Sequence, residues 1–253
     1  KGVSRVDKVY VVTDFGPGDG GKGGIVHALS CMQDDEVNLI IKRGGAQGSH
    51  GVRTSYQESF NFSQWGCGTL EGIPTFCSEQ MIISPVGLDN EYTALRRLGI
   101  DDPFLLLSID PNCICATPYH MISSQLEELL LGKNPRGTIG TGVGRAYRMF
   151  HESGDTLTLR AIELTDKTLI RKKLQRQCEY YRAKYDEAVK TSILPEDMAI
   201  AEDNLALLAD DGYLQYCLEL FEAIGKRLKF MDLPEALCQA GTAIVECSHG
   251  VLT

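Results

Sequence analysis

The hydrophobic and polar positions divide the chain into two regions of different character. Short apolar runs lie at residues 9–12 and 37–41. Their length and continuity are typical of strands buried on both faces of a sheet. Between them, residues 25–29 carry apolar positions at a spacing that favours one face of a helix. This strand–helix–strand order predicts an α/β fold with a mostly parallel central sheet.

Further short elements follow the first strand–helix–strand unit. The pattern predicts strands at residues 81–83, 104–109 and 113–116 and helices at 85–98 and 120–131. Residues 54–62 alternate loosely between apolar and polar side chains, which predicts an exposed β-hairpin arm.

From Thr165 the periodicity becomes helical. Apolar positions recur at steps of three and four residues at Ile170, Leu174, Cys178, Tyr181 and Tyr185. This spacing predicts a long amphipathic helix, and further helices are expected at 198–208 and 213–228. We therefore expect a helical block at about 163–232, inserted into an α/β fold.

The apolar residues 243–245 then predict a return to the sheet, followed by a loop at 246–250. We expect residues 1–253 to form a single α/β domain. A natural domain seldom ends at a fresh loop after a strand, so we also expect the chain to continue beyond its carboxyl end.

Composition narrows the function classes. The net charge of −9 argues against nucleic acid or a membrane surface as the main partner. No apolar run is long enough to span a bilayer. The nine cysteines contain no C-x-x-C pair, which indicates reduced, mostly buried thiols and a cytoplasmic setting.

A glycine-rich loop with one lysine follows the first predicted strand. Residues 16–24 read G-P-G-D-G-G-K-G-G and precede the predicted helix, an arrangement that brings backbone amides and a positive charge close to phosphate. The loop satisfies G-x-x-x-x-G-K, but the usual Ser/Thr after the lysine is Gly23. Asp19 could supply the missing magnesium ligand or act as a base, or it could simply cap the helix.

Two more loops rich in small residues lie at 43–51 and 133–145. Ligands of open α/β sheets bind outside the carboxyl ends of the strands, so we expect all three loops to meet there. His50 lies among small polar residues, which makes a buried core histidine improbable and leaves a catalytic or a solvated one. Thr138 and Thr141 could bind a ligand or only cap a helix that starts near Val143.

Four motifs, in order along the chain, resemble those of the adenylosuccinate synthetases. Residues 18–23 resemble the G-D-E-G-K-G signature of that family, and 43–50 resemble its R-G-G-x-N-A-G-H-T. Residues 137–147 are similar to G-T-T-x-x-G-I-G-P-A-Y, and 245–252 to F-E-G-A-Q-G-x-L. Each motif is weak alone, but the ordered set points to the superfamily and to a P-loop-like glycine-rich loop.

The resemblance implies a reaction and its residues. In the family, a base takes the N1 proton of a 6-oxopurine nucleotide while O6 attacks the γ-phosphate of GTP, which forms a 6-phosphoryl intermediate. The amine of aspartate then displaces phosphate from this intermediate. Asp19 would be the base and a magnesium ligand, His50 the general acid, and Lys22 a phosphate ligand. Such phosphoryl transfer depends on positioning and charge neutralisation.

The remaining implied positions fall into three groups. Nucleotide-binding positions are Gly18, Gly20, Gly21, Lys22, Gly23 and Gly51. Substrate-binding positions are Gln47, Thr138, Ile139 and His249. Metal-binding positions are Asp19 and the backbone carbonyl of Ser49.

Departures from the family pattern lie on the side of the purine monophosphate. Gln47 replaces an asparagine, Ile139 a threonine, Arg145 a proline and His249 a glutamine. This pattern suggests an altered nucleotide, and some phage relatives use dGMP. Those relatives replace the catalytic aspartate by serine, whereas Asp19 is kept here, which favours IMP.

The implied partners are GTP or ATP, IMP or dGMP, L-aspartate and Mg²⁺, in a homodimer. Two alternatives stay open: a non-catalytic nucleotide-binding paralogue and an unrelated P-loop-like NTPase.

Overall fold

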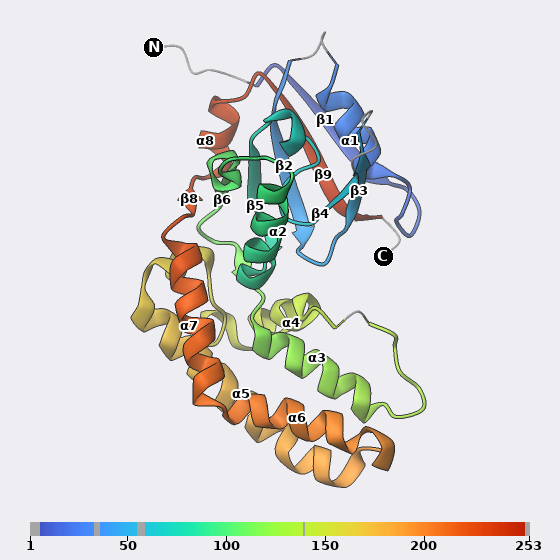
Figure 1. Ribbon diagram of the computed structural model, residues 1–253, viewed down its shortest axis with the longest axis vertical. Helices are drawn as coiled ribbons and strands as arrows, with labels where there is room; N and C mark the ends of the chain where they lie inside the picture. The colour runs from blue at the N-terminus through green and yellow to red at the C-terminus, as the bar shows by residue number, and fades with distance from the viewer. Residues whose placement is uncertain (1–5, 33–35, 55–58, 139, 251–253) are drawn as a thin grey trace. The chain divides into compact units, whose positions relative to one another are not determined.

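The computed structural model describes residues 6–32, 36–54, 59–138 and 140–250 (Figure 1). The chain divides into two compact units, which are described separately. The first unit comprises Lys1–Ile83, Gly87–Cys113 and Arg227–Thr253. The second comprises Ser84–Val86 and Ile114–Lys226.

The first unit is an α/β assembly. Its strands are β1 (Lys8–Asp14), β2 (Val37–Gly45), β3 (His50–Arg53), β4 (Ser59–Phe62), β5 (Thr75–Ile83), β6 (Leu107–Ile109), β8 (Lys229–Phe230) and β9 (Thr242–Gly250). Its helices are α1 (Lys22–Ser30), most of α2 (Pro85–Arg97), α8 (Leu233–Cys238) and the short 3₁₀ turns η1 (Thr69–Glu71) and η2 (Pro103–Leu106).

A parallel sheet organises this unit, with strand order β1-β9-β2-β5-β6-β8. Each of these neighbouring pairs is parallel. The last strand, β9, lies between β1 and β2, so the carboxyl-terminal segment occupies the middle of the amino-terminal βαβ unit (Figure 1). The predicted fold class, α/β with a mostly parallel central sheet, is confirmed.

Apolar side chains explain why these strands are central. Leu39 and Ile41 of β2, Phe76 of β5 and Ala243 of β9 are buried in one cluster with residues of α8. Ile40 and Ile244 are fully buried as well. Strands with both faces covered read as continuous apolar runs, and β2 fits that prediction. For β1 the prediction is wrong, because Val9 and Val11 are 45% and 64% exposed and of its apolar run only Val12 is buried.

Three strand predictions need correction. The strand expected at 104–109 is only Leu107–Ile109, because Asp102 and Pro103 start the turn η2 and the Asp102 side chain accepts a hydrogen bond from the Phe104 amide. The strand expected at 81–83 begins at Thr75, since polar residues in its middle concealed it. The loop expected at 246–250 is instead the end of β9, paired to β1 and β2.

The expected hairpin is present with different bounds. Strands β3 and β4 pair antiparallel, with His50 opposite Phe62 and Arg53 opposite Ser59. The arm therefore begins at His50 rather than at residue 54. Residues 55–58, which the prediction also covered, lie outside the described residues.

The second unit is mainly helical. Its elements are β7 (Ile114–Cys115), α3 (Pro118–Leu130), α4 (Val143–Ser153), η3 (Gly154–Thr156), η4 (Ala161–Thr165), α5 (Lys167–Ser192), η5 (Pro195–Asp197), α6 (Met198–Ala209) and α7 (Asp211–Gly225). The helical region thus starts well before residue 163, because α3 and α4 belong to it. The single α/β domain with a helical insertion stays a prediction.

The long helix α5 buries the stripe that its periodicity predicted. Ile170, Leu174, Tyr181 and Tyr185 are buried, and Cys178 is half-buried. Within the part of the chain that the structure describes, no helix combines the length and hydropathy needed to cross a membrane.

Candidate phosphate-binding and catalytic site

Three parallel strands end side by side at the candidate site. Strand β1 ends at Asp14, β2 at Gly45 and β9 at Gly250, and β9 pairs with both neighbours. Asp14 lies opposite Gly250 in the register of β1 and β9. The loops after β1 and β2 therefore leave the same sheet edge. The third loop, 133–142, belongs to the second unit.

Three residues of the first loop have left-handed backbone conformations, as a tight glycine-rich turn requires. Gly18 and Gly21 have φ of 114° and 82°, and Asp19, although not glycine, has φ of 58°. Gly21 is the residue that precedes α1, and no side chain caps this helix. The alternative that Asp19 caps α1 is therefore wrong. Its side chain is exposed and has no hydrogen-bond or ion-pair partner among the residues that the structure describes.

Lys22 is held in place by an acid that the sequence analysis missed. The Lys22 side chain is 3% exposed and forms an ion pair with the Asp14 carboxylate, which also accepts a hydrogen bond from the Gly20 amide at 3.2 Å. The hydrogen bond from Lys22 holds the pKa of Asp14 below its usual value. A cation is thus fixed at the first turn of α1, where the helix dipole disfavours it and an anion would be stabilised. The position of Asp14, at the end of β1 and two residues before Gly16, was the available signal.

His50 is buried on β3, so the expectation that it would not be a buried histidine is wrong. It is positioned by a second acid that the sequence analysis did not assign. Its Nδ1 lies 2.5 Å from Oε1 of Glu246, a fully buried residue on β9. The other ring nitrogen, Nε2, is buried and has no hydrogen-bond partner within the described ranges. Because the carboxylate holds the Nδ1 proton, Nε2 is the atom left to exchange a proton with a ligand.

Glu246 accepts hydrogen bonds from two further donors. Its Oε1 accepts a hydrogen bond from the Lys42 ammonium at 2.8 Å, and its Oε2 accepts one from the Cys67 amide at 2.9 Å. Burial by itself would raise the pKa of Glu246, but Lys42 and His50 outweigh it and lower the pKa to about 2. The carboxylate is therefore ionised throughout the physiological range. Charged side chains within otherwise apolar strands were the signal for this network.

The first turn of α1 packs directly on the strand that carries His50. A Cβ atom at Gly23 would lie 2.6 Å from the carbonyl oxygen of Gly51 and 3.0 Å from the carbonyl carbon of His50. Only glycine permits this approach. The glycine-rich loop, Lys22 and His50 are thereby held as one group.

The end of β9 joins the two loops of the first unit. His249 Nε2 lies 3.1 Å from Nε2 of Gln47, and the Ser248 hydroxyl donates to the Arg43 carbonyl at 2.8 Å. A Cβ at Gly250 would lie 2.0 Å from the Gly16 carbonyl oxygen. Two of the expected substrate-binding residues, Gln47 and His249, are therefore neighbours.

The other expected substrate-binding residues belong to the second unit. Thr138 is exposed, and Ile139 lies outside the described residues. Gly142 precedes α4 and no side chain caps that helix, so neither Thr138 nor Thr141 is its cap. Arg145 is buried and forms an ion pair with Glu127.

The donors near the first loop fit magnesium. Asp19 offers an exposed carboxylate, and Ser49 is exposed in the second loop. Mg²⁺ commonly takes one or two carboxylates and completes its shell with substrate phosphates and water. Of the described residues, those that cluster as possible metal ligands do not include Asp19. A magnesium ion here would therefore need phosphate oxygens.

The fold and the site define a class: an α/β protein whose glycine-rich loop, with a buried lysine, and carboxylate-held histidine lie near the carboxyl ends of parallel strands. The chain belongs to the adenylosuccinate synthetase family, whose family model matches residues 11–222.

Curated relatives agree with this family. The adenylosuccinate synthetase of Pasteurella multocida is 30% identical over 200 residues, which cover 76% of this chain and 44% of the relative. That of Neisseria gonorrhoeae is 30% identical over 166 residues, 65% of this chain and 37% of the relative. That of Mycobacteroides abscessus is 25% identical over 241 residues, 93% of this chain and 50% of the relative. The chain thus spans half or less of the length of these relatives.

Two solved structures share the fold. Fully ligated adenylosuccinate synthetase from Plasmodium falciparum superposes with a TM-score of 0.64 at 16% identity, covering 97% of this chain and 52% of that one. Succinoaminodeoxyadenylate synthetase of cyanophage S-2L, bound to dGMP and to dATP as an energy donor, has a TM-score of 0.55 at 14% identity, with the same coverage.

Proposed function

We propose that this protein is a carbon–nitrogen ligase that condenses L-aspartate with a 6-oxopurine nucleotide at the expense of GTP or ATP. IMP is the preferred candidate for the nucleotide. The family match supports the reaction class, and the site in the first unit supports the phosphoryl step. By analogy with the family, the protein acts in the cytoplasm as a homodimer in purine biosynthesis.

The phosphate loop binds the triphosphate in this proposal. Amides of Gly20 to Gly23 and the positive end of α1 surround the phosphate oxygens, with Gly18 and Gly51 beside them. The Lys22 ammonium, fixed by Asp14, faces the β- and γ-phosphates. Asp19 and the Ser49 carbonyl would hold Mg²⁺ together with phosphate oxygens, and the bound ion would neutralise phosphate charge.

Asp19 and His50 move protons. The Asp19 carboxylate takes the N1 proton of the purine while O6 attacks the γ-phosphorus and the bond to the leaving nucleoside diphosphate breaks. His50 Nε2 donates to an oxygen of the transferring phosphoryl group, and the Glu246 carboxylate stabilises the imidazolium. The aspartate amine then displaces inorganic phosphate from C6.

One observation carries this proposal above a simple nucleotide-binding role. His50 is fixed at Nδ1 by a buried, ionised carboxylate, while Nε2 has no partner among described residues. Burying a charge pair costs free energy, and nucleotide binding alone does not require a buried pair at this histidine. A histidine with one nitrogen anchored and the other available is the geometry of a general acid.

The test is phosphate release with IMP, L-aspartate, GTP and Mg²⁺. We expect release that requires all four components, and a His50→Gln variant about 10²- to 10⁴-fold slower with nucleotide affinity unchanged. Arg53→Gln, an exposed change on the same strand, should keep full activity and serves as the control.

Two outcomes would reject the proposal. Nucleotide binding without release for any 6-oxopurine monophosphate, and with no effect of Asp19→Ala or His50→Ala, would indicate a non-catalytic paralogue. Hydrolysis that needs neither monophosphate nor aspartate would indicate a separate NTPase.

A second substrate, dGMP, is the alternative. The contact between Gln47 and His249 replaces an asparagine and a glutamine of the family pattern, and the cyanophage relative of known structure binds dGMP. Parallel assays with IMP and dGMP decide between them. If His249 reads the purine, His249→Gln will change the ratio of kcat/KM for the two nucleotides.

A further inference from the structure

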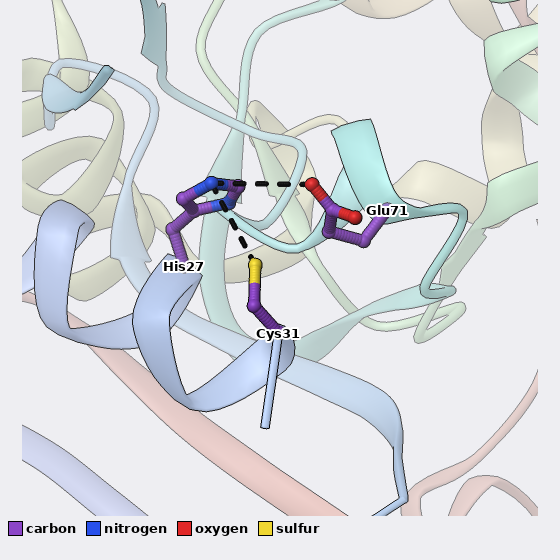
Figure 2. Close-up of side chains that lie close together, drawn as sticks. All are labelled: His27, Cys31 and Glu71. Atoms are coloured by element: carbon purple, nitrogen blue, oxygen red, sulfur yellow. Dashed lines mark hydrogen bonds and ion pairs between the residues drawn. The ribbon is translucent and has the colours of Figure 1, made fainter. Parts of the chain in front are cut away.

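Away from the phosphate-binding site, three side chains of metal-ligand type converge at the far end of α1. His27 lies on α1 and Cys31, four residues later, directly follows the helix in helical conformation, so the two share one face, and Glu71 approaches them from η1 (Figure 2). His27 Nε2 lies 3.8 Å from Cys31 Sγ and 3.9 Å from Glu71 Oε1. The three ligand atoms all lie within 4.8 Å of one another.

The three ligand atoms are spaced as ligands around a common metal position would be. At 3.9 Å the histidine and glutamate are too far apart for a hydrogen bond. Ligands of tetrahedral zinc lie about 2.0 to 2.3 Å from the metal, which places them roughly 3.3 to 3.6 Å from each other. The two distances from His27 exceed that spacing by a few tenths of an ångström, and the distance between Cys31 and Glu71 is at most 4.8 Å, so side-chain shifts of up to about 1 Å would bring the three atoms to it.

The supporting elements are fixed. A Cβ at Gly68 would lie 2.8 Å from the Ser30 hydroxyl oxygen, so the segment before Glu71 packs on the end of α1. Thr69 is buried and donates to the Gly66 carbonyl at 2.7 Å. His27 Nδ1 is buried without a partner among the described residues, so the ring's contacts lie on its Nε2 side.

We propose that His27, Cys31 and Glu71 form a site for a zinc-class divalent cation, with water as the fourth ligand. A thiolate, an imidazole and one carboxylate favour zinc over magnesium. Cys31 and Glu71 are exposed, so the cation can enter from solvent. On binding, the Cys31 S–H bond breaks, a sulfur–metal bond forms and the proton passes to solvent.

A second cluster of the same residue types does not qualify. His50, Cys67 and Glu246 also lie close together, but they are buried and the Lys42 ammonium already occupies Glu246. Burial raises the pKa of Cys67, and burial together with Glu71 also raises the pKa of Cys31, so it is the ion pair between Lys42 and Glu246 that separates the two clusters.

The site would tie the end of α1 to η1. Because α1 begins at Lys22, a cation at His27 and Cys31 would restrain the helix that carries the phosphate loop. Its role would be structural, and it would be independent of the magnesium used with nucleotide.

Titration of the protein with Co²⁺ in excess Mg²⁺ tests the site. We expect one Co²⁺ per chain, with a thiolate charge-transfer band and the visible bands of tetrahedral cobalt, displaced by Zn²⁺. Cys31→Ser should abolish the charge-transfer band, and His27→Gln and Glu71→Gln should each weaken binding about 10- to 100-fold or more. Cys238→Ser, at another exposed cysteine of the first unit, should change nothing.

Circular dichroism of each variant verifies folding, and Glu71→Gln tests the site without removing a cysteine. Absence of a charge-transfer band in the folded wild-type protein would overturn the proposal. So would a band that survives in Cys31→Ser or one that is lost in Cys238→Ser.

Discussion

Glu246 is the buried carboxylate that holds Lys42 and His50 in place. It is fully buried on β9, and it binds the ammonium of Lys42 on β2 and the imidazole of His50 on β3. Removing one member of such a group leaves a buried charge without compensation, which costs far more than removing the whole group. Glu246 is thus a positioning residue for His50.

A double-mutant cycle tests this dependence. Glu246→Gln should lower the free energy of unfolding by about 3 to 5 kcal/mol, because Lys42 stays charged and buried. Adding Lys42→Met should restore part of that loss, since no charge then lacks its partner. Urea unfolding of the wild type, the two single variants and the double variant gives the coupling energy. Additive effects would show that the pair is not coupled.

Ionisation of Glu246 also makes the stability of the folded protein depend on pH in the acid range. Its folded pKa of about 2 lies below the ordinary value of 4.5, so its contribution to stability is present above pH 4.5 and is lost as pH falls toward 2. The Glu246→Gln variant should lack this part of the acid dependence.

At the scale of elements, the contact between α1 and β3 determines the spacing of the site. Gly23→Ala would place a methyl group 2.6 Å from the Gly51 carbonyl oxygen. We expect α1 to move and phosphate release to fall at least about tenfold, because small displacements of catalytic groups are costly.

Its matched control is the next residue. A Cβ at Gly24 meets no atom within 4 Å, so Gly24→Ala should stabilise the helix by roughly 0.5 to 1 kcal/mol and leave activity unchanged. Equal effects of the two alanines on activity would contradict the packing argument.

The amino terminus of α3 contains a buried neutral histidine. His120 Nδ1 accepts a hydrogen bond from the Thr117 amide at 2.9 Å, and burial lowers its pKa to about 3 from the usual 6.5. The unfolded chain therefore binds a proton more readily than the folded one between these values. The stability of the second unit should be complete above pH 6.5 and should fall by up to about 1.4 kcal/mol per pH unit below it.

Unfolding measured from pH 7 to pH 4 checks this expectation. His120→Gln should flatten the slope whatever its effect on overall stability. Replacing the exposed His151 in the same unit by glutamine should leave the slope unchanged.

At the scale of the whole molecule, ligand binding should appear as stability. A non-hydrolysable GTP analogue with Mg²⁺ at 100 times its dissociation constant should stabilise the folded protein by about 2.7 kcal/mol. Calorimetry measures this as a rise in Tm of the transition that contains the first unit. Chelation of Mg²⁺ or Lys22→Met should remove most of the rise, and an unchanged rise in Lys22→Met would separate that lysine from nucleotide binding.

Local chemistry made part of the site predictable. Asp19 and Lys22 lie within one turn of a strand–loop–helix unit, so their neighbourhood is set by sequence distance. Asp14 and Glu246 were not assigned, because each becomes part of the site only through another element. Glu246 reaches His50 from 196 residues away. The strand Leu107–Ile109 was overextended because Asp102 and Pro103 favour a turn more strongly than the apolar run favours a strand.

The sequence by itself determined the alternation of strands and amphipathic helices and the backbone freedom of the glycine-rich loop. It also determined that Asp19, Lys22 and His50 lie in the segments that follow β1 and β2. These features follow from local periodicity and residue chemistry. Tertiary structure decided that β9 enters between β1 and β2. That placement puts the Glu246 carboxylate beside Lys42, its partner in the register of β2 and β9, and within reach of His50. Both contacts join residues about 200 positions apart, a distance that local periodicity does not specify. It also decided that α1 touches η1, where His27, Cys31 and Glu71 meet.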